Sequence, residues 1–282
     1  ITDRGPHIYT NASDRVCNEC GMANTLDPIL EKEADGKYYY YVNGWRENIT
    51  ELVKIDGTWY YVANGVWDTS IDTLHKINGK WFLIQKGIWK SQTAIVLYSG
   101  KYFYVSGGKW NSSVNKIVSY NGKNYYVKSG KWDSSVNGVK AIGSTSYLIK
   151  KGMWSKTTEL YKSGSTYYYI KSGKWSKTTG IVKIGSTSYY IKSGKWSKTT
   201  GIVKIGSTQY YVKSGKWSKT TTLYKKSGKY YAIKDGKVTK SKVIIKYSGK
   251  KYYCYKGYAQ TSYSGKVTIS GKKYTVKKGI VK

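Results

Sequence analysis

The sequence predicts an all-β fold, an elongated solenoid of about twelve stacked β-hairpin repeats of 21–22 residues, preceded by a small Cys-x-x-Cys segment. Three observations support this fold class. The 282 residues include 32 Tyr and 11 Trp but only two Pro, and aromatic and β-branched residues favour strands. Asn-Gly, Ser-Gly and Gly-Lys pairs mark frequent turns. Tryptophan also recurs at a nearly constant interval.

This interval defines the repeats. Segment 180–200 is followed by 201–221 with only two substitutions. A period of this size indicates units that cannot bury an apolar face alone and must stack on their neighbours. Small apolar residues continue the interval to the end of the chain. The full series is Trp45, Trp67, Trp89, Trp110, Trp132, Trp154, Trp175, Trp196, Trp217, Val238, Ala259 and Val281.

Each repeat reads as one hairpin. An apolar residue such as Ile181 opens a short strand, and an aromatic strand such as 59–62 follows the turn. A second glycine turn then leads to the Trp and to a polar loop such as 176–179. The residue pairs at the first turn accept the positive φ angles of tight hairpins. Examples are Asp56-Gly57, Asn78-Gly79, Ser99-Gly100 and Asn121-Gly122.

Strand alternation assigns the aromatic strand two faces. Tyr60 and Val62 and their counterparts are always apolar or aromatic, so we expect them to face the core. The position between them predicts a ladder of half-exposed tyrosines, interrupted by Leu83, Leu148 and Ala232. The ladder comprises Tyr61, Tyr104, Tyr126, Tyr169, Tyr190, Tyr211 and Tyr253.

This ladder has two interpretations. Flat rings can stack on sugars, with nearby lysines pairing with charged substituents, or the tyrosines can simply pack between units. Retention of apolar residues where Trp is lost favours a structural role for the Trp series, although a loop Trp can also form a wall of a ligand pocket. The candidate ligand-binding residues are Tyr61, Tyr104, Tyr126, Tyr169, Tyr190, Tyr211, Trp154, Trp175, Trp196, Trp217, Lys174, Lys195 and Lys216.

Charge is distributed very unevenly. The net charge is +34, but residues 1–75 hold six Lys/Arg and twelve Asp/Glu, so residues 76–282 carry about +40. Lysines can protect strand edges and maintain solubility, but this excess also predicts attraction of polyanions. Nucleic acid could bind through its phosphates. Because no Arg follows residue 46, base-specific recognition is not expected.

The repeat order of turn, Gly, x, aromatic, Tyr, Tyr, Val resembles the cell-wall-binding repeats of Gram-positive surface proteins, which include choline-binding, glucan-binding and clostridial toxin modules. Segments 56–62 and 78–82 are close to its Gly-Lys-Trp-Tyr-Tyr core, and the resemblance covers about residues 36–282. It implies a non-catalytic, secreted or cell-surface module. Choline binders carry Gly-Trp where this chain has Ile181 and Ile202, so the cage for a quaternary ammonium ion is incomplete.

The predicted domains are residues 1–34, a cap or linker, and residues 35–282, the repeat array. His7, Cys17 and Cys20 lie in a pattern that resembles a short His/Cys module of secreted proteins of gut Firmicutes. These three residues suit zinc but are one ligand short of a closed site, and a Cys17–Cys20 disulfide is the alternative. No other cofactor is expected. Cys254 replaces Val or Ile of neighbouring repeats and should be a buried apolar substitute.

The sequence contains no catalytic constellation. Only Asp133, Glu159 and Asp235 supply carboxylates after residue 75, and glycoside hydrolysis needs two that lie together. No apolar run is long enough to insert in a membrane. The leading hypothesis is a binding module for a cell-wall or dietary polysaccharide or an anionic wall polymer such as teichoic acid. The alternative is a structural stalk or a fibre that assembles end to end.

Overall fold

The computed structural model describes residues 27–282, and this range contains 36 strands and no helix. The strands number three for each of the twelve predicted repeats, which confirms the all-β hairpin array. No helix within the described range is long and apolar enough to cross a membrane. The chain divides into two compact units. Unit 1 holds the described residues up to 137 with 149–154, and unit 2 holds 138–148 with 155–282.

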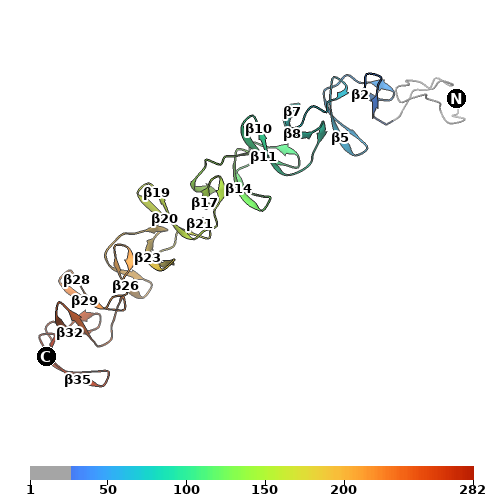
Figure 1. Ribbon diagram of the computed structural model, residues 1–282. Coiled ribbons are helices and arrows are strands. Elements are labelled where there is room, and N and C mark those ends of the chain that lie inside the picture. The colour runs from blue at the N-terminus through green and yellow to red at the C-terminus, as the bar shows by residue number, and fades with distance from the viewer. Residues whose placement is uncertain (1–26) are drawn as a thin grey trace. The chain divides into compact units, whose positions relative to one another are not determined.

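Each repeat contributes two hairpin strands and a two-residue strand that normally ends in the Trp, a succession that can be followed within each unit in Figure 1. The first strands along the chain are β1 (Ile29–Lys32), β2 (Tyr38–Val42), β3 (Trp45–Arg46), β4 (Glu51–Ile55), β5 (Thr58–Ala63), β6 (Val66–Trp67), β7 (Leu74–Ile77), β8 (Lys80–Gln85), β9 (Ile88–Trp89), β10 (Ala94–Tyr98), β11 (Lys101–Ser106), β12 (Lys109–Trp110), β13 (Lys116–Tyr120), β14 (Lys123–Lys128), β15 (Lys131–Trp132), β16 (Gly138–Ile142), β17 (Thr145–Lys150) and β18 (Met153–Trp154). The remaining strands are β19 (Glu159–Ser163), β20 (Thr166–Lys171), β21 (Lys174–Trp175), β22 (Gly180–Ile184), β23 (Thr187–Lys192), β24 (Lys195–Trp196), β25 (Gly201–Ile205), β26 (Thr208–Lys213), β27 (Lys216–Trp217), β28 (Thr222–Lys226), β29 (Lys229–Lys234), β30 (Lys237–Val238), β31 (Val243–Tyr247), β32 (Lys250–Tyr255), β33 (Tyr258–Ala259), β34 (Gly265–Ile269), β35 (Lys272–Lys277) and β36 (Ile280–Val281).

The hairpin turns confirm the predicted turn chemistry. At the β4–β5 turn, Asp56 and Gly57 have φ angles of 46° and 79°. Two positive φ angles in a two-residue turn are the pattern of type I′, whose twist matches paired strands. The second turn of each repeat uses the same pattern, as at Ser193 and Gly194 with 49° and 76°.

Consecutive repeats within a unit are joined by backbone hydrogen bonds. Strand β5 pairs with β4 inside its own hairpin and with β9 of the next repeat. The amide of Tyr61 donates to the carbonyl of Gly87 at 2.8 Å, and in unit 2 the amide of Tyr190 donates to Gly215 at 2.8 Å. Every hairpin therefore supplies hydrogen-bond donors to the second turn of the one that follows.

The core runs through the aromatic strand of each hairpin. Its Val or Ile position is fully buried, as predicted, and includes Cys254 at 0% exposure. The aromatic residue two positions earlier, such as Tyr60 or Tyr168, was predicted to face the core as well but is only half-buried, because its ring lies at the edge of the joint beside the Trp. Burial raises the pKa of the Cys254 thiol to about 12, so this side chain behaves as a small apolar residue. The series is Val62, Ile84, Val105, Val127, Ile149, Ile170, Ile191, Val212, Ile233 and Cys254.

The prediction of a half-exposed tyrosine ladder is wrong at most of its positions. Tyr61 is only 6% exposed and packs with Ile77 and Ile84 of the following hairpin. The next repeat thus covers the face that alternation assigned to solvent, because stacking buries both sides of the aromatic strand. Of the others, Tyr126 and Tyr211 are half-buried. The remaining buried members are Tyr104, Tyr169, Tyr190 and Tyr253.

Charged side chains contact the tyrosines of the first described hairpin, β1–β2. The Arg46 guanidinium lies 3.4 Å from the centre of the Tyr39 ring, and Tyr39 and Tyr41 donate hydroxyl hydrogen bonds to Asp35 and Glu33. Burial and the Glu33 carboxylate raise the pKa of Tyr41 to about 12.

His7, Cys17 and Cys20 lie outside the described residues, and the domain boundary at 34/35 stays a prediction.

Candidate functional site

The tryptophan near the end of a repeat is held by two contacts, as Trp175 shows. The Trp175 ring meets the edge of Tyr168 in a T-shaped arrangement, with centroids 5.4 Å apart. Its indole Nε1 donates to the carbonyl of Gly194 at 3.0 Å, and that carbonyl also accepts the amide of Tyr169 at 2.8 Å. One carbonyl thus joins the indole and the hairpin stack, and this supports the structural role predicted for the Trp series.

The same indole bond recurs along both units. Its glycine acceptor leaves no room for a larger residue, because a β-carbon at Gly194 would lie 2.5 Å from Trp175 Nε1 and 2.6 Å from the carbonyl of Ser176. The Trp–Gly pairs are Trp67–Gly87, Trp89–Gly108, Trp110–Gly130, Trp132–Gly152, Trp175–Gly194, Trp196–Gly215 and Trp217–Gly236.

Lysine ammonium groups lie over the aromatic rings that surround each Trp. In unit 2, Lys195 Nζ is 5.6 Å from the centre of the Tyr168 ring, because β24 pairs with β20 of the preceding repeat. Lys177 Nζ lies 5.3 Å from the Trp175 ring. These distances are within the range of cation–π attraction. Equivalent pairs are Lys174–Tyr147, Lys216–Tyr189, Lys237–Tyr210, Lys198–Trp196 and Lys219–Trp217.

Unit 1 repeats the arrangement with phenylalanine. Lys109 Nζ is 5.6 Å from the Phe82 ring and 5.4 Å from the Trp89 ring. Lys131 Nζ lies 5.2 Å from Phe103 and 5.9 Å from Trp110. Each joint between these repeats therefore presents a cation beside its aromatic pair.

The structure brings some of the predicted site residues together and separates others. Lys174, Lys195 and Lys216 lie beside the rings of Tyr147, Tyr168 and Tyr189, which the sequence reasoning had assigned only to the core. The half-buried Trp175, Trp196 and Trp217 lie beside such lysines as well, and Trp154 is half-buried in unit 1. Tyr169 and Tyr190 are instead enclosed in the stack. A constant spacing of 27 residues from Tyr to Lys was the signal that could have identified these pairs.

Among residues 27–282, no group of three or more His, Cys, Asp or Glu side chains is placed to hold a metal ion. The one described histidine, His75, lies 3.1 Å from the hydroxyl of Tyr61 through Nε2. This contact is part of the packing around Tyr61 between two repeats of unit 1.

No protein-family model matches the chain, and no curated protein matches it. Several solved structures are similar. Choline binding protein F from Streptococcus pneumoniae shares 17% identity, with 92% of this chain and 99% of that chain covered and a TM-score of 0.44. CbpJ from the same organism shares 18%, with 90% and 100% covered and a TM-score of 0.43. The modular autolysin LytC from Streptococcus pneumoniae shares 16%, with 81% of this chain but 51% of that chain covered and a TM-score of 0.48.

Proposed function

We propose that the chain is a non-catalytic module that attaches to an anionic polymer of the bacterial surface, such as teichoic acid, through its repeated lysines. The observation that carries this proposal is the placement of a lysine ammonium over an aromatic ring at successive joints, as with Lys174, Lys195 and Lys216. Acidic side chains that could neutralise these cations are almost absent after residue 75. The exposed Lys195 and Lys216 therefore remain available to an external anion.

A repeating ligand suits a repeating protein. A polymer with one negative charge per unit can contact several joints at once, and each further contact forms at high effective concentration. A single exposed ion pair contributes only about 0.2–1 kcal/mol, so useful affinity requires many of them. An array of near-identical repeats provides that number without any strong individual site.

Charge rather than ring stacking is the favoured mode of attachment. Burial of Tyr61, Tyr104, Tyr169 and Tyr190 leaves little ring surface for a sugar, and the Trp rings already have lysine ammonium groups near their faces. We assign the buried tyrosines to holding the stack and the half-buried Trp175, Trp196 and Trp217 to positioning the lysines. The same ammonium groups disfavour choline, since like charges repel.

Binding to isolated Gram-positive cell walls across a salt series tests the proposal. The triple variant K174Q/K195Q/K216Q should bind about tenfold more weakly, which is the sum of three modest ion pairs. The control K183Q/K204Q/K246Q makes the same charge change at exposed lysines of the first hairpin strands and should lose much less. Wild-type binding should disappear near 1 M salt, where the Debye length is about 3 Å. Equal binding to walls stripped of anionic polymer would refute the proposal.

A further inference from the structure

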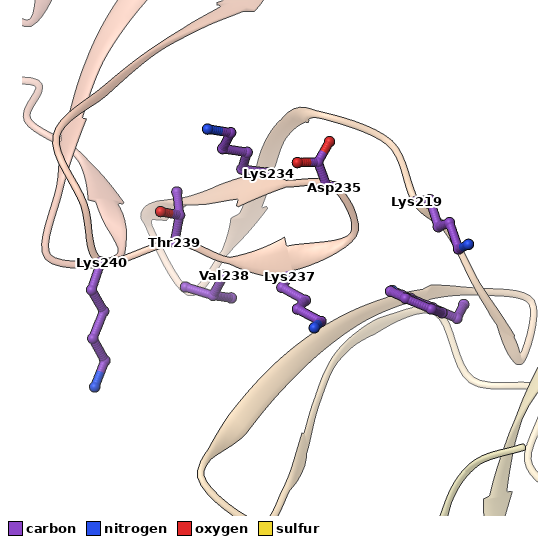
Figure 2. Close-up of a pocket in the computed structure, with 8 residues that line it drawn as sticks. Lys219, Lys234, Asp235, Lys237, Val238, Thr239 and Lys240 are labelled. Carbon is purple, nitrogen blue, oxygen red and sulfur yellow. The ribbon is translucent and has the colours of Figure 1, made fainter. Parts of the chain in front are cut away.

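One joint of unit 2 differs from its neighbours and contains a pocket of about 610 Å³. It lies where the Trp series ends, between Trp217 and the next repeat, in which Val238 takes the place of Trp. Figure 2 shows the pocket, with Lys219 on one side and Lys237, Val238, Thr239 and Lys240 around the β29–β30 hairpin end. Val238 thus contributes a smaller apolar side chain to this lining than a Trp would.

Loss of the indole also changes the backbone of this joint. A β-carbon built at Gly257 would meet only Val238, at 3.5 Å, whereas at Gly236 it would meet the Trp217 indole and nearby backbone. The amide of Gly236 donates to Thr220 at 2.9 Å, but in the next repeat Lys256, not Gly257, donates to the corresponding loop. The loop after Val238 is therefore shifted by one residue relative to its counterparts. The Tyr258 ring lies 4.9 Å from the ring of Tyr231, the residue that corresponds to the indole partners Tyr168 and Tyr210.

The lining of this pocket is strongly cationic. Lys219 Nζ and Lys237 Nζ lie 5.1 and 5.9 Å from the centre of one ring, that of Trp217. Lys234 and Lys240 also contribute, against a single acid, Asp235. In Figure 2 Lys234 and Asp235 project on the opposite side of the β29–β30 turn from Lys237. The Asp235 amide donates a hydrogen bond to the Thr221 hydroxyl at 3.1 Å. This bond links the β29–β30 turn to the loop that follows Trp217.

We propose that this pocket is a discrete binding site for a phosphorylated sugar. The ammonium groups of Lys219 and Lys237 bind the phosphate oxygens through charge-assisted hydrogen bonds. Val238 and the edge of Trp217 contact the apolar face of the sugar ring, and Thr239 offers a hydroxyl to the sugar hydroxyls. The inference rests on the proposed function in that a phosphate-containing polymer supplies the ligand, and it adds a defined site at one joint of the array.

Isothermal titration calorimetry of the full chain with glucose 6-phosphate tests this site, with glucose as the neutral comparison. V238W restores the aromatic residue of the earlier repeats and should weaken binding at least tenfold by filling the pocket. K219Q/K237Q changes two exposed side chains without touching the core and should weaken it to a similar extent. V281W makes the same substitution at the last repeat, outside the pocket, and should leave binding unchanged.

Unaltered glucose 6-phosphate binding in both V238W and K219Q/K237Q would overturn the site, and so would tighter binding of glucuronate than of the phosphate. The proposed function fails separately. V238W retains Lys174, Lys195 and Lys216, so it should still bind cell walls. Loss of the sugar phosphate together with retained wall binding in V238W supports the pocket and leaves the array function intact.

Discussion

Replacement of Gly194 by alanine tests whether the indole–glycine joint holds the repeats together. The control is Gly228→Ala, since both glycines follow a serine in a two-residue turn and have φ angles of 76° and 75°. Alanine costs about 1 kcal/mol in the left-handed region at either site. Only Gly194 is crowded, with Trp175 Nε1, the Ser176 carbonyl and Lys177 Cα at 2.5, 2.6 and 2.9 Å from an added β-carbon, whereas nothing lies within 4 Å at Gly228.

The difference between the two variants follows from these contacts. Overpacking costs about 1–3 kcal/mol, and displacement of the indole from the Gly194 carbonyl costs about 1 kcal/mol more. Gly194→Ala should therefore destabilise unit 2 by about 2–4 kcal/mol more than Gly228→Ala. Urea unfolding followed by tryptophan fluorescence measures the total, and hydrogen exchange at the Tyr169 amide, which donates to Gly194, measures the local opening. Equal destabilisation within about 0.5 kcal/mol would refute the role of the joint.

Two further predictions concern buried titratable groups. In a C17S/C20S background, native Cys254 should not react with a thiol reagent at pH 8, because burial raises its pKa to about 12, and reaction at the rate of a free thiol would contradict the packing. The raised pKa of Tyr41, from 10.0 to about 12, means that the protonated phenol favours the folded state. Its contribution is fully present below pH 10 and is lost as pH rises through 12, so Y41F should flatten the alkaline loss of stability measured by circular dichroism.

Local signals in the sequence predicted the hairpins correctly. Asp56-Gly57 and its counterparts specify two-residue turns through their positive φ angles, and period-2 alternation identified Val62 and Ile191 as core. These features depend on a few adjacent residues, so a single sequence can reveal them. The interval of 21–22 residues between successive tryptophans likewise predicted the repeat.

Period-2 alternation gave the wrong burial for Tyr61 and Tyr190, because it assumes a sheet with one buried face and one solvent-exposed face. In this array the following hairpin covers the other face, so a strand buried on both sides looks amphipathic only when considered alone. The same stacking placed Lys195 over Tyr168, a pairing between repeats. The residue pattern within one repeat does not show which lysine of the next repeat will lie over its tyrosine.

By itself, the sequence determined the hairpin unit, its turns, the inward Val and Ile positions and the polycationic character of the array. Only the tertiary structure decided that most of the ladder tyrosines lie inside the stack, that lysines gather beside the Trp and Tyr rings, and that a pocket lies beside Val238. The physical reason is distance along the chain. Turns and strand faces are set by neighbouring residues, whereas burial, cation–π contacts and cavities depend on side chains that stacking brings together from different repeats.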